Sequence, residues 1–95
     1  MTLIRCLIPT PLRPTVNNQS EIELTLDGSL YDVLHDLIKT YSSLKKYLLD
    51  DQGQFRGYIN YYINDKDIRD LNSFDTLLSD GDTLSIVPAI AGGFL

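Results

Sequence analysis

The residues best suited to chemistry stand near the C-terminal end, where Ala91-Gly92-Gly93 is followed by Phe94-Leu95. Two consecutive glycines carry no Cβ atoms, so their backbone can enter a narrow channel and adopt angles closed to other residues. Such a backbone can approach another molecule closely, and Ala91 before it adds only the smallest side chain. Phe94 opposes this use, because its ring is too bulky for the channel and its peptide bond occupies the carboxylate of Gly93. The pattern predicts a tail whose chemistry requires a chain that ends at Gly93.

The other candidate residues do not predict a catalytic or metal site. Cys6 is the only cysteine, and alternation along its strand places it on the inward face, where we expect a packed, unreactive thiol. His35 is the only histidine and falls off the apolar stripe of its helix, which predicts a solvent-side position without metal-ligand partners. Asp80 and Asp82 flank a turn glycine, where carboxylates simply accept backbone hydrogen bonds. We therefore expect no enzyme activity and no bound metal.

Length and composition favour a single domain. The chain has 95 residues, of which 43% are hydrophobic and 22% charged, as in ordinary globular domains. A formal net charge of -5, with only Lys45-Lys46 adjacent among the basic residues, argues against a nucleic-acid partner. The acidic residues concentrate between Asp65 and Asp82, which suits either docking onto a basic protein groove or plain solvation. We recognise neither a membrane-spanning stretch nor a signal peptide, so we expect a cytoplasmic protein without a membrane partner.

Apolar periodicity predicts the elements that must position the tail. Strands are expected over residues 2–8, 21–26, 58–64, at a short edge near Ile68, and over 83–87, where Pro88 ends the last one. One main helix should follow Ser29 as its N-cap, with Asp32 completing a capping box. A short second helical turn is expected over residues 44–49.

The remaining segments are expected to be irregular. Prolines after the first strand predict a long loop over residues 10–19, and a polar, glycine-bearing loop is expected over 50–57. Residues 64–67 are predicted to form a turn. A short helical plug made by Phe74, Leu77 and Leu78 should close one end of the core.

The order of these elements predicts an α+β fold. One helix lying across one face of a mixed sheet of four to five strands is the economical way to bury the apolar faces. The first and last strands would pair in parallel at the centre of that sheet. Residues 1–88 are then expected to form the domain, and residues 89–95 a flexible C-terminal tail.

Three segments carry a resemblance to a known family. They are Ile8-Pro9-Thr10 with Leu12-Arg13-Pro14, the run from Tyr61 to Arg69, and the run from Leu78 to Gly93. In these segments the chain resembles the ubiquitin-like β-grasp sulfur carriers, the family that contains ThiS, MoaD and CysO. The third segment is the family's shared C-terminal signature, and the other two look most like the CysO branch, which supplies sulfur for cysteine synthesis.

The resemblance implies a carrier on which partner enzymes act. Active family members stop at Gly-Gly, so a processing metalloprotease would remove Phe94-Leu95. An E1-like adenylyltransferase/sulfurtransferase would use ATP to adenylate the carboxylate of Gly93, and a sulfur nucleophile would displace AMP to leave a thiocarboxylate. A biosynthetic enzyme, of which a PLP-dependent cysteine synthase is one, would accept the sulfur for cysteine or a related metabolite. ATP is used by the activating partner, and the carrier itself is expected to bind no cofactor.

Alternation along the strands also predicts a docking face. Five side chains are expected on the sheet face opposite the helix: Leu3, Leu7, Tyr58, Tyr62 and Val87. If their strands are neighbours, they form an exposed apolar patch beside the point where the tail leaves, and such patches mark interaction sites. The alternative is that single apolar residues on a strand are ordinary surface.

Three further functions stay open. Within the same class, the sulfur could serve thiamin or molybdopterin synthesis, because the acceptor enzyme decides the product. A ubiquitin-like modifier would share the activation step but join target lysines through Gly93. A plain β-grasp binding module would keep Phe94-Leu95 and never be processed.

Overall fold

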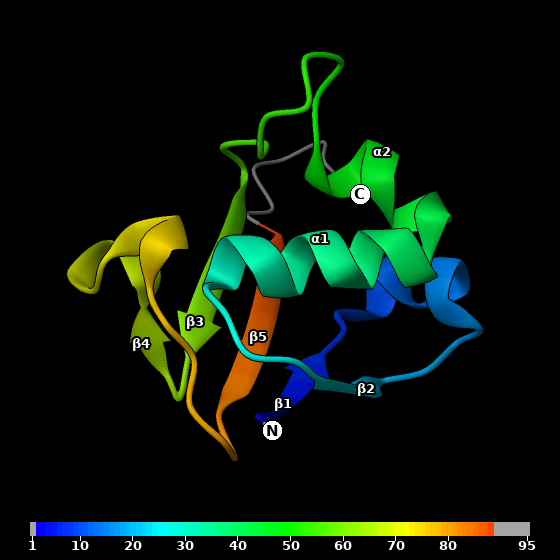
Figure 1. The fold of residues 1–95 in the computed structure, drawn as a ribbon. Helices are drawn as coiled ribbons and strands as arrows, with labels where there is room; N and C mark the ends of the chain where they lie inside the picture. Colours follow the sequence, from blue (N-terminus) through cyan, green and yellow to red (C-terminus); the bar gives the residue numbers. More distant parts are fainter. Residues whose placement is uncertain (1, 89–95) are drawn as a thin grey trace.

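The structure is a computed structural model that describes residues 2–88. A mixed sheet forms one layer, and helix α1 lies across one of its faces (Figure 1). In chain order the elements are β1 (Leu3–Leu7), 3-10 helix η1 (Thr10–Val16), β2 (Glu21–Thr25), α1 (Leu30–Thr40), η2 (Ser42–Leu44), α2 (Lys45–Leu48), β3 (Ile59–Ile63), β4 (Lys66–Asp67), η3 (Ile68–Asp70), η4 (Ser73–Asp75) and β5 (Thr83–Pro88). The predicted α+β architecture, with a mixed sheet and one main helix, is confirmed.

β5 is the central strand of the sheet, whose order is β2-β1-β5-β3-β4. It runs parallel to β1, with Leu84 opposite Cys6, and antiparallel to β3, with Ile86 opposite Tyr61. The predicted parallel pairing of the first and last strands is therefore confirmed. The chain that continues beyond Pro88 leaves from a strand held on both sides.

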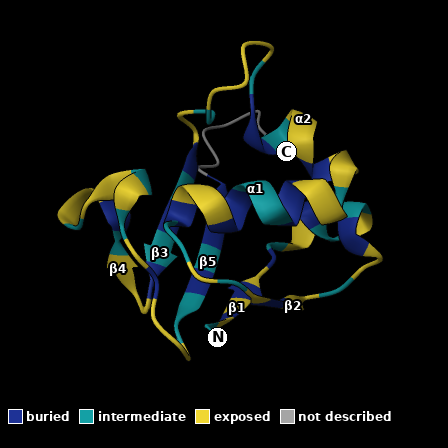
Figure 2. Ribbon diagram, in the orientation of Figure 1, coloured by how far each residue is buried: buried dark blue, intermediate teal, exposed yellow. Residues whose placement is uncertain are grey.

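Alternation of apolar residues decides which face of the sheet α1 covers. In β1, Ile4 and Cys6 are buried while their neighbours are exposed. In β3 the alternate residues Ile59, Tyr61 and Ile63 are buried. The buried residues of α1 are Leu30, Val33, Leu34, Leu37 and Ile38. Figure 2 shows these buried stretches meeting between α1 and the sheet, where exclusion of water from both apolar faces stabilises the fold.

The start of α1 forms the predicted capping box. The Asp32 N–H donates to the Ser29 hydroxyl over 3.3 Å, and the Ser29 N–H donates to the Asp32 carboxylate over 3.0 Å. The negative charge of Asp32 also suits the positive end of the helix dipole. A Cβ atom on Gly28 would lie 2.7 Å from the Asp32 carboxylate, so this close approach requires a glycine.

The segment of residues 10–19 is more regular than the predicted loop. Its first part forms η1, which begins at Thr10 and contains Pro11 and Pro14. Proline fixes φ near -65°, an angle that 3-10 helices share, so these residues favour the turn while they prevent strand pairing. Leu12 and Val16 project from η1 into the core and hold it there.

The edge of the sheet differs from the prediction by a few residues. Asn64 and Asp65 alone make the turn after β3, with φ angles of 51° and 70° that suit a two-residue hairpin turn. β4 therefore forms at residues 66–67, earlier than predicted. Ile68 belongs to η3, which Asp67 caps by accepting a hydrogen bond from the Arg69 N–H over 2.8 Å.

The predicted helical plug is only partly correct. Residues 73–75 form η4, Phe74 packs against the core, and Leu78 is buried. Leu77 was expected in the core but is 75% exposed. Its backbone bridges to Ser29 in an isolated β-bridge instead of continuing the helix, which turns its side chain outward.

His35 is half-buried, so its predicted solvent-side position is only partly correct. Its ring lies 4.2 Å from that of Tyr31 and 5.5 Å from that of Phe55, measured between centroids. Its Nε2 atom is shielded from solvent and has no hydrogen-bond partner among residues 2–88. Phe55 comes from the segment after α2, so periodicity along α1 alone does not reveal this contact.

Replacing Tyr61 by phenylalanine should stabilise the domain. Tyr61 is 1% exposed, its hydroxyl has no hydrogen-bond partner within the described residues, and burial raises its pKa above the ordinary range. Removing an unpaired buried hydroxyl should recover about 1 kcal/mol, while the ring keeps its edge contacts with Phe55 and Phe74. Urea unfolding of Tyr61→Phe beside the wild type measures this change. A loss of stability in the variant would contradict it.

Candidate functional site

The candidate site is the end of the sheet from which the C-terminal tail departs. Pro88, the last described residue, is buried at the end of β5 and lies opposite Ile59. The predicted tail of residues 91–93 and the extension Phe94-Leu95 lie outside the described residues. Gly93 is the fifth residue after Pro88, so an extended backbone can carry its carboxyl group at most about 17 Å from the end of β5.

An apolar hollow of about 380 Å³ lies beside the end of β5. Its lining residues are Leu7, Ile8, Pro9, Pro11, Ser85, Ile86, Val87 and Pro88. β1 and β5 are parallel, so both strands end on this side of the sheet, and Pro9 then directs the chain from β1 into η1. Leu7 is 37% exposed and Val87 40% exposed. The hollow can accept apolar side chains of a protein that takes the tail.

The structure brings some of the predicted docking residues together and separates others. Leu7 and Val87 line the apolar hollow, and the exposed Tyr58 immediately precedes Ile59, the partner of Pro88. Tyr62 is half-buried and lies opposite Ser85, further along the same face. Leu3 lies at the other end of β1, about 13 Å from Leu7 along the strand. Docking by these five residues stays a prediction.

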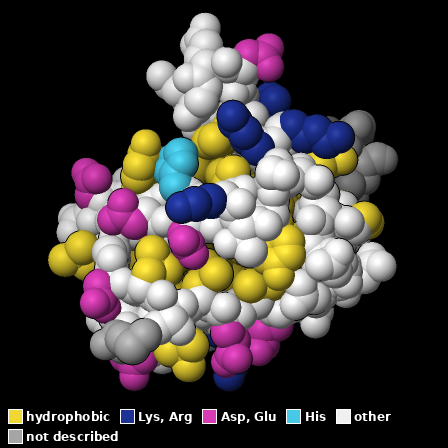
Figure 3. All heavy atoms as spheres, turned by 45° about the vertical axis from the view of Figure 1, so that its right-hand side comes forward, with side chains coloured by type: hydrophobic (Ala, Val, Ile, Leu, Met, Phe, Trp, Pro, Cys, Tyr) yellow, Lys and Arg dark blue, Asp and Glu magenta, His cyan; other side chains and the backbone are white. Residues whose placement is uncertain are grey.

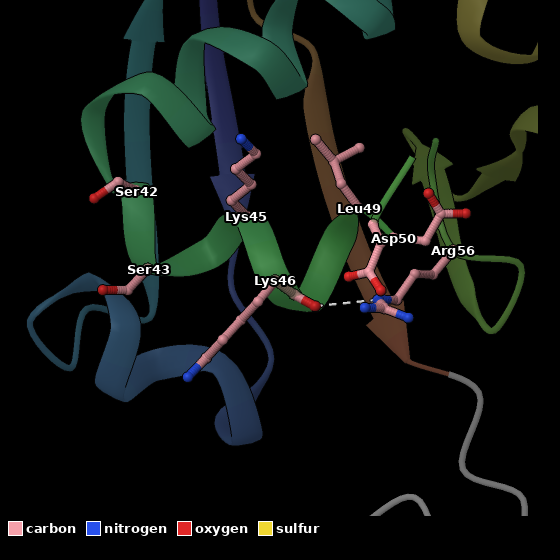
Figure 4. Close-up of a pocket in the computed structure, with 8 residues that line it drawn as sticks. Ser42, Ser43, Lys45, Lys46, Leu49, Asp50 and Arg56 are labelled. Atoms are coloured by element: carbon pink, nitrogen blue, oxygen red, sulfur yellow. Dashed lines mark hydrogen bonds between the residues drawn. The ribbon is translucent and has the colours of Figure 1, made fainter. Parts of the chain in front are cut away.

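A second hollow, of about 580 Å³, lies beside α2 and is rich in charged side chains (Figure 4). Its lining residues are Ser42, Ser43, Lys45, Lys46, Leu49, Asp50, Asp51 and Arg56. The Arg56 side chain donates from Nε to the Lys46 carbonyl over 3.1 Å. The backbone N–H of Arg56 donates to the Leu48 carbonyl over 2.9 Å. These two bonds hold the segment before β3 against α2. Sequence reasoning missed this hollow, because only the Lys45-Lys46 pair is adjacent in the chain.

Asp50 orders the loop that follows α2. Its carboxylate accepts hydrogen bonds from the N–H groups of Gln54 and Gln52, over 3.0 and 2.8 Å. These two donors, with the nearby positive charge of Arg56, hold the pKa of Asp50 below its ordinary range. The loop is therefore folded back on itself close to the charged hollow.

The titratable residues near the sheet serve the fold. Burial raises the pKa of the Cys6 thiol to about 12, so the reactive thiolate is scarce at neutral pH, as predicted from its inward position. Both carboxylates accept backbone hydrogen bonds, as expected: Asp82 from the Ser79 N–H within the turn over 2.7 Å, and Asp80 from the Leu3 N–H at the start of β1 over 2.8 Å. Within residues 2–88, three or more His, Cys, Asp and Glu side chains do not come together in a group that could hold a metal ion. The described part of the site therefore consists of an apolar hollow and a charged hollow on the surface near the end of β5.

Comparison with known proteins decides the family. The ThiS family profile matches residues 6–93. This chain belongs to the ThiS family. The sulfur carrier protein CysO of Mycobacterium tuberculosis is 38% identical to this ThiS-family chain over 88 residues, which cover 90% of the chain and 94% of CysO.

Solved structures of the same fold agree with the ThiS-family assignment. A chain in the crystal structure of the Amycolatopsis orientalis BexX/CysO complex has a TM-score of 0.82 at 30% identity, covering 95% of this chain and 99% of that one. Small archaeal modifier protein 1 of Methanosarcina acetivorans has a TM-score of 0.84 at 30% identity, with 98% of both chains covered. The predicted ubiquitin-like β-grasp fold and the resemblance to sulfur carriers are confirmed.

The ThiS-family match runs through Ala91-Gly92-Gly93 of the predicted tail and ends on the second glycine, Gly93. Phe94 and Leu95 lie beyond it. Among residues 2–88, the helices are all too short or too polar to cross a membrane.

Proposed function

We propose that this chain is a sulfur carrier whose Gly93 carboxyl group, after removal of Phe94-Leu95, becomes a thiocarboxylate that donates sulfur. The observation that carries the proposal is the ThiS-family match, which runs through the β-grasp domain and ends at Gly93. The 38% identity to a sulfur carrier named CysO favours cysteine, or a related sulfur metabolite, as the product.

The proposed chemistry needs four steps, which three partner enzymes catalyse. A metalloprotease hydrolyses the Gly93–Phe94 bond and releases the dipeptide Phe-Leu. An E1-like adenylyltransferase/sulfurtransferase catalyses attack of a Gly93 carboxylate oxygen on the α-phosphorus of ATP. This attack expels pyrophosphate and forms the acyl adenylate. Hydrosulfide then attacks the acyl carbon, AMP departs with that oxygen, and loss of the proton leaves the thiocarboxylate. A sulfur-accepting enzyme, for which we propose a PLP-dependent cysteine synthase, takes the sulfur onward.

The geometry of the described residues supports a passive role of this kind. The tail begins at the end of a central strand, so its starting point is fixed relative to the sheet. The apolar hollow lined by Leu7 and Val87 lies beside that point. A partner bound in this hollow would be held in a fixed position relative to the start of the tail. A carrier needs a reachable carboxylate and a surface that docks it, and the catalytic groups belong to the partners.

The intact mass of the protein isolated from its native cells tests the proposal. We expect a chain that has lost Phe94-Leu95 and carries sulfur in place of one terminal oxygen. The likeness to small archaeal modifier protein 1 favours one competing outcome, a trimmed chain without sulfur that is joined to lysines of other proteins. A chain that keeps Phe94-Leu95 under sulfur-demanding growth would overturn the proposed processing.

A further inference from the structure

Two groups of charged side chains lie at opposite ends of the sheet. Four carboxylates gather at the end where β5 begins: Asp27, Asp65, Asp80 and Asp82. The Asn64 amide donates to Asp82 over 2.8 Å, and Asp65 follows in the same turn. Asp27 accepts from the Thr2 hydroxyl, immediately before β1. This acidic end lies opposite the end from which the tail leaves.

Basic side chains gather at the tail end. We call Lys45, Lys46 and Arg56 the basic end; together they hold three of the eight basic side chains in a protein of net charge -5. Figure 3 shows Lys and Arg side chains grouped at the top of the face drawn, with most Asp and Glu side chains below them. Among residues 2–88 the ion pairs are Arg5–Glu21 and Arg69–Asp67, so none of the basic end is neutralised in this way.

The carboxylates near the basic end cancel only part of its charge, because two negative side chains stand against three positive ones. Asp50 and Asp51 line the same hollow as the three basic side chains. Asp50 already accepts hydrogen bonds from the Gln52 and Gln54 N–H groups. The hollow therefore keeps an excess of positive charge in a domain that is acidic as a whole.

The basic end lies where a protein that receives the tail must make contact. The carbonyl of Arg56 accepts from the Ile59 N–H over 3.3 Å, and Ile59 lies opposite Pro88. Arg56 is thus close to the origin of the tail, and its Nε bond to the Lys46 carbonyl brings α2 to the same place. Because the Gly93 carboxyl group reaches at most about 17 Å from β5, the receiving protein covers this end of the sheet.

We propose that the basic end docks on an acidic surface of the adenylating partner, beside the channel that takes the tail. This inference rests on the proposed function. Charges of opposite sign at the two ends make the carrier an electric dipole, which turns the tail toward the partner during encounter. Charge complementarity of this kind acts mainly on the rate and orientation of association, so its signature is a rate that depends on salt. The overall negative charge disfavours a nucleic acid as the occupant.

Charge reversal with a matched control tests this inference. The test variant is Lys45→Glu with Lys46→Glu, and the control is Lys66→Glu with Arg69→Glu at the sheet edge, which changes the net charge equally. Both are made in the chain that ends at Gly93, which keeps every residue of the described fold. Thiocarboxylate formation is followed by intact mass in an extract of the native cells, supplied with MgATP and sulfide and with the carrier limiting.

We expect the test variant to form thiocarboxylate about tenfold more slowly than the wild type at low salt, with the difference closing toward 1 M salt. The control should stay within about twofold of the wild type. Equal losses in both variants, or no loss in the test variant, would overturn the basic end as a docking surface while the carrier role stands. A wild-type chain that gains no sulfur would overturn the proposed function itself, and the inference with it.

Discussion

Replacing Gly92 by valine in the chain that ends at Gly93 should reduce thiocarboxylate formation by at least about a hundredfold. A branched side chain at this position widens the tail where it must pass through a narrow channel and restricts the backbone angles it can adopt. The reacting carboxyl group belongs to the next residue, Gly93. A small displacement of residue 92 therefore moves the carboxylate oxygen out of reach of the α-phosphorus of ATP. The rate is measured by intact mass with MgATP, sulfide and the extract of native cells.

Two controls separate tail chemistry from folding. Residue 92 follows the last strand, which ends at Pro88, so we expect Gly92→Val to leave the thermal unfolding midpoint unchanged. Ala91→Ser adds one oxygen before the glycine pair and should retain most of the rate. If Gly92→Val loads sulfur as fast as the wild type, the tail does not enter a glycine-width channel.

Replacing Leu84 by alanine should cost about 3 kcal/mol of the free energy of unfolding. Leu84 is fully buried on the central strand, opposite Cys6 on one side and Ile63 on the other, so neighbouring elements cannot readily close the cavity. In a domain of this size that loss lowers the Tm by about 12 °C or more. Thermal and urea unfolding measure it.

Leu77→Ala is the matched control, because it removes the same atoms from a side chain that is 75% exposed. Its free energy of unfolding should stay within about 0.5 kcal/mol of the wild type. Similar losses of unfolding free energy in the two variants would contradict the difference in burial between Leu84 and Leu77.

The strands and the main helix could be predicted because their signals are local. Alternation in residues 58–64 and the Ser29–Asp32 capping box each depend on a few neighbouring residues, and the structure has both. His35 could not be placed in this way, because its neighbour Phe55 reaches α1 from a segment some twenty residues further on. The prediction that Leu77 belongs to a helical plug was wrong for a related reason, because a backbone bridge to Ser29 overrides the helical pattern.

The candidate site, like the fold, could be predicted from the sequence only in part. Leu7 and Val87 follow from alternation and the parallel pairing of the first and last strands, and both line the apolar hollow. Leu3 satisfies the same alternation but lies at the other end of β1, because alternation fixes a face and not a position along it. The basic end depends on Arg56 folding back onto Lys46, which a pattern in sequence does not contain.

The central position of β5 also determines how the domain responds to mechanical force. If a partner drew the tail into a channel along the axis of β5, the pull would act on Pro88. That strand is flanked by β1 and β3, so the load falls in shear on hydrogen bonds of both ladders at once. Bonds loaded in shear share the force, whereas those of an edge strand peeled from its end break one after another. We expect a domain with this arrangement to resist unfolding by such a pull better than one whose last strand lies at the edge of the sheet.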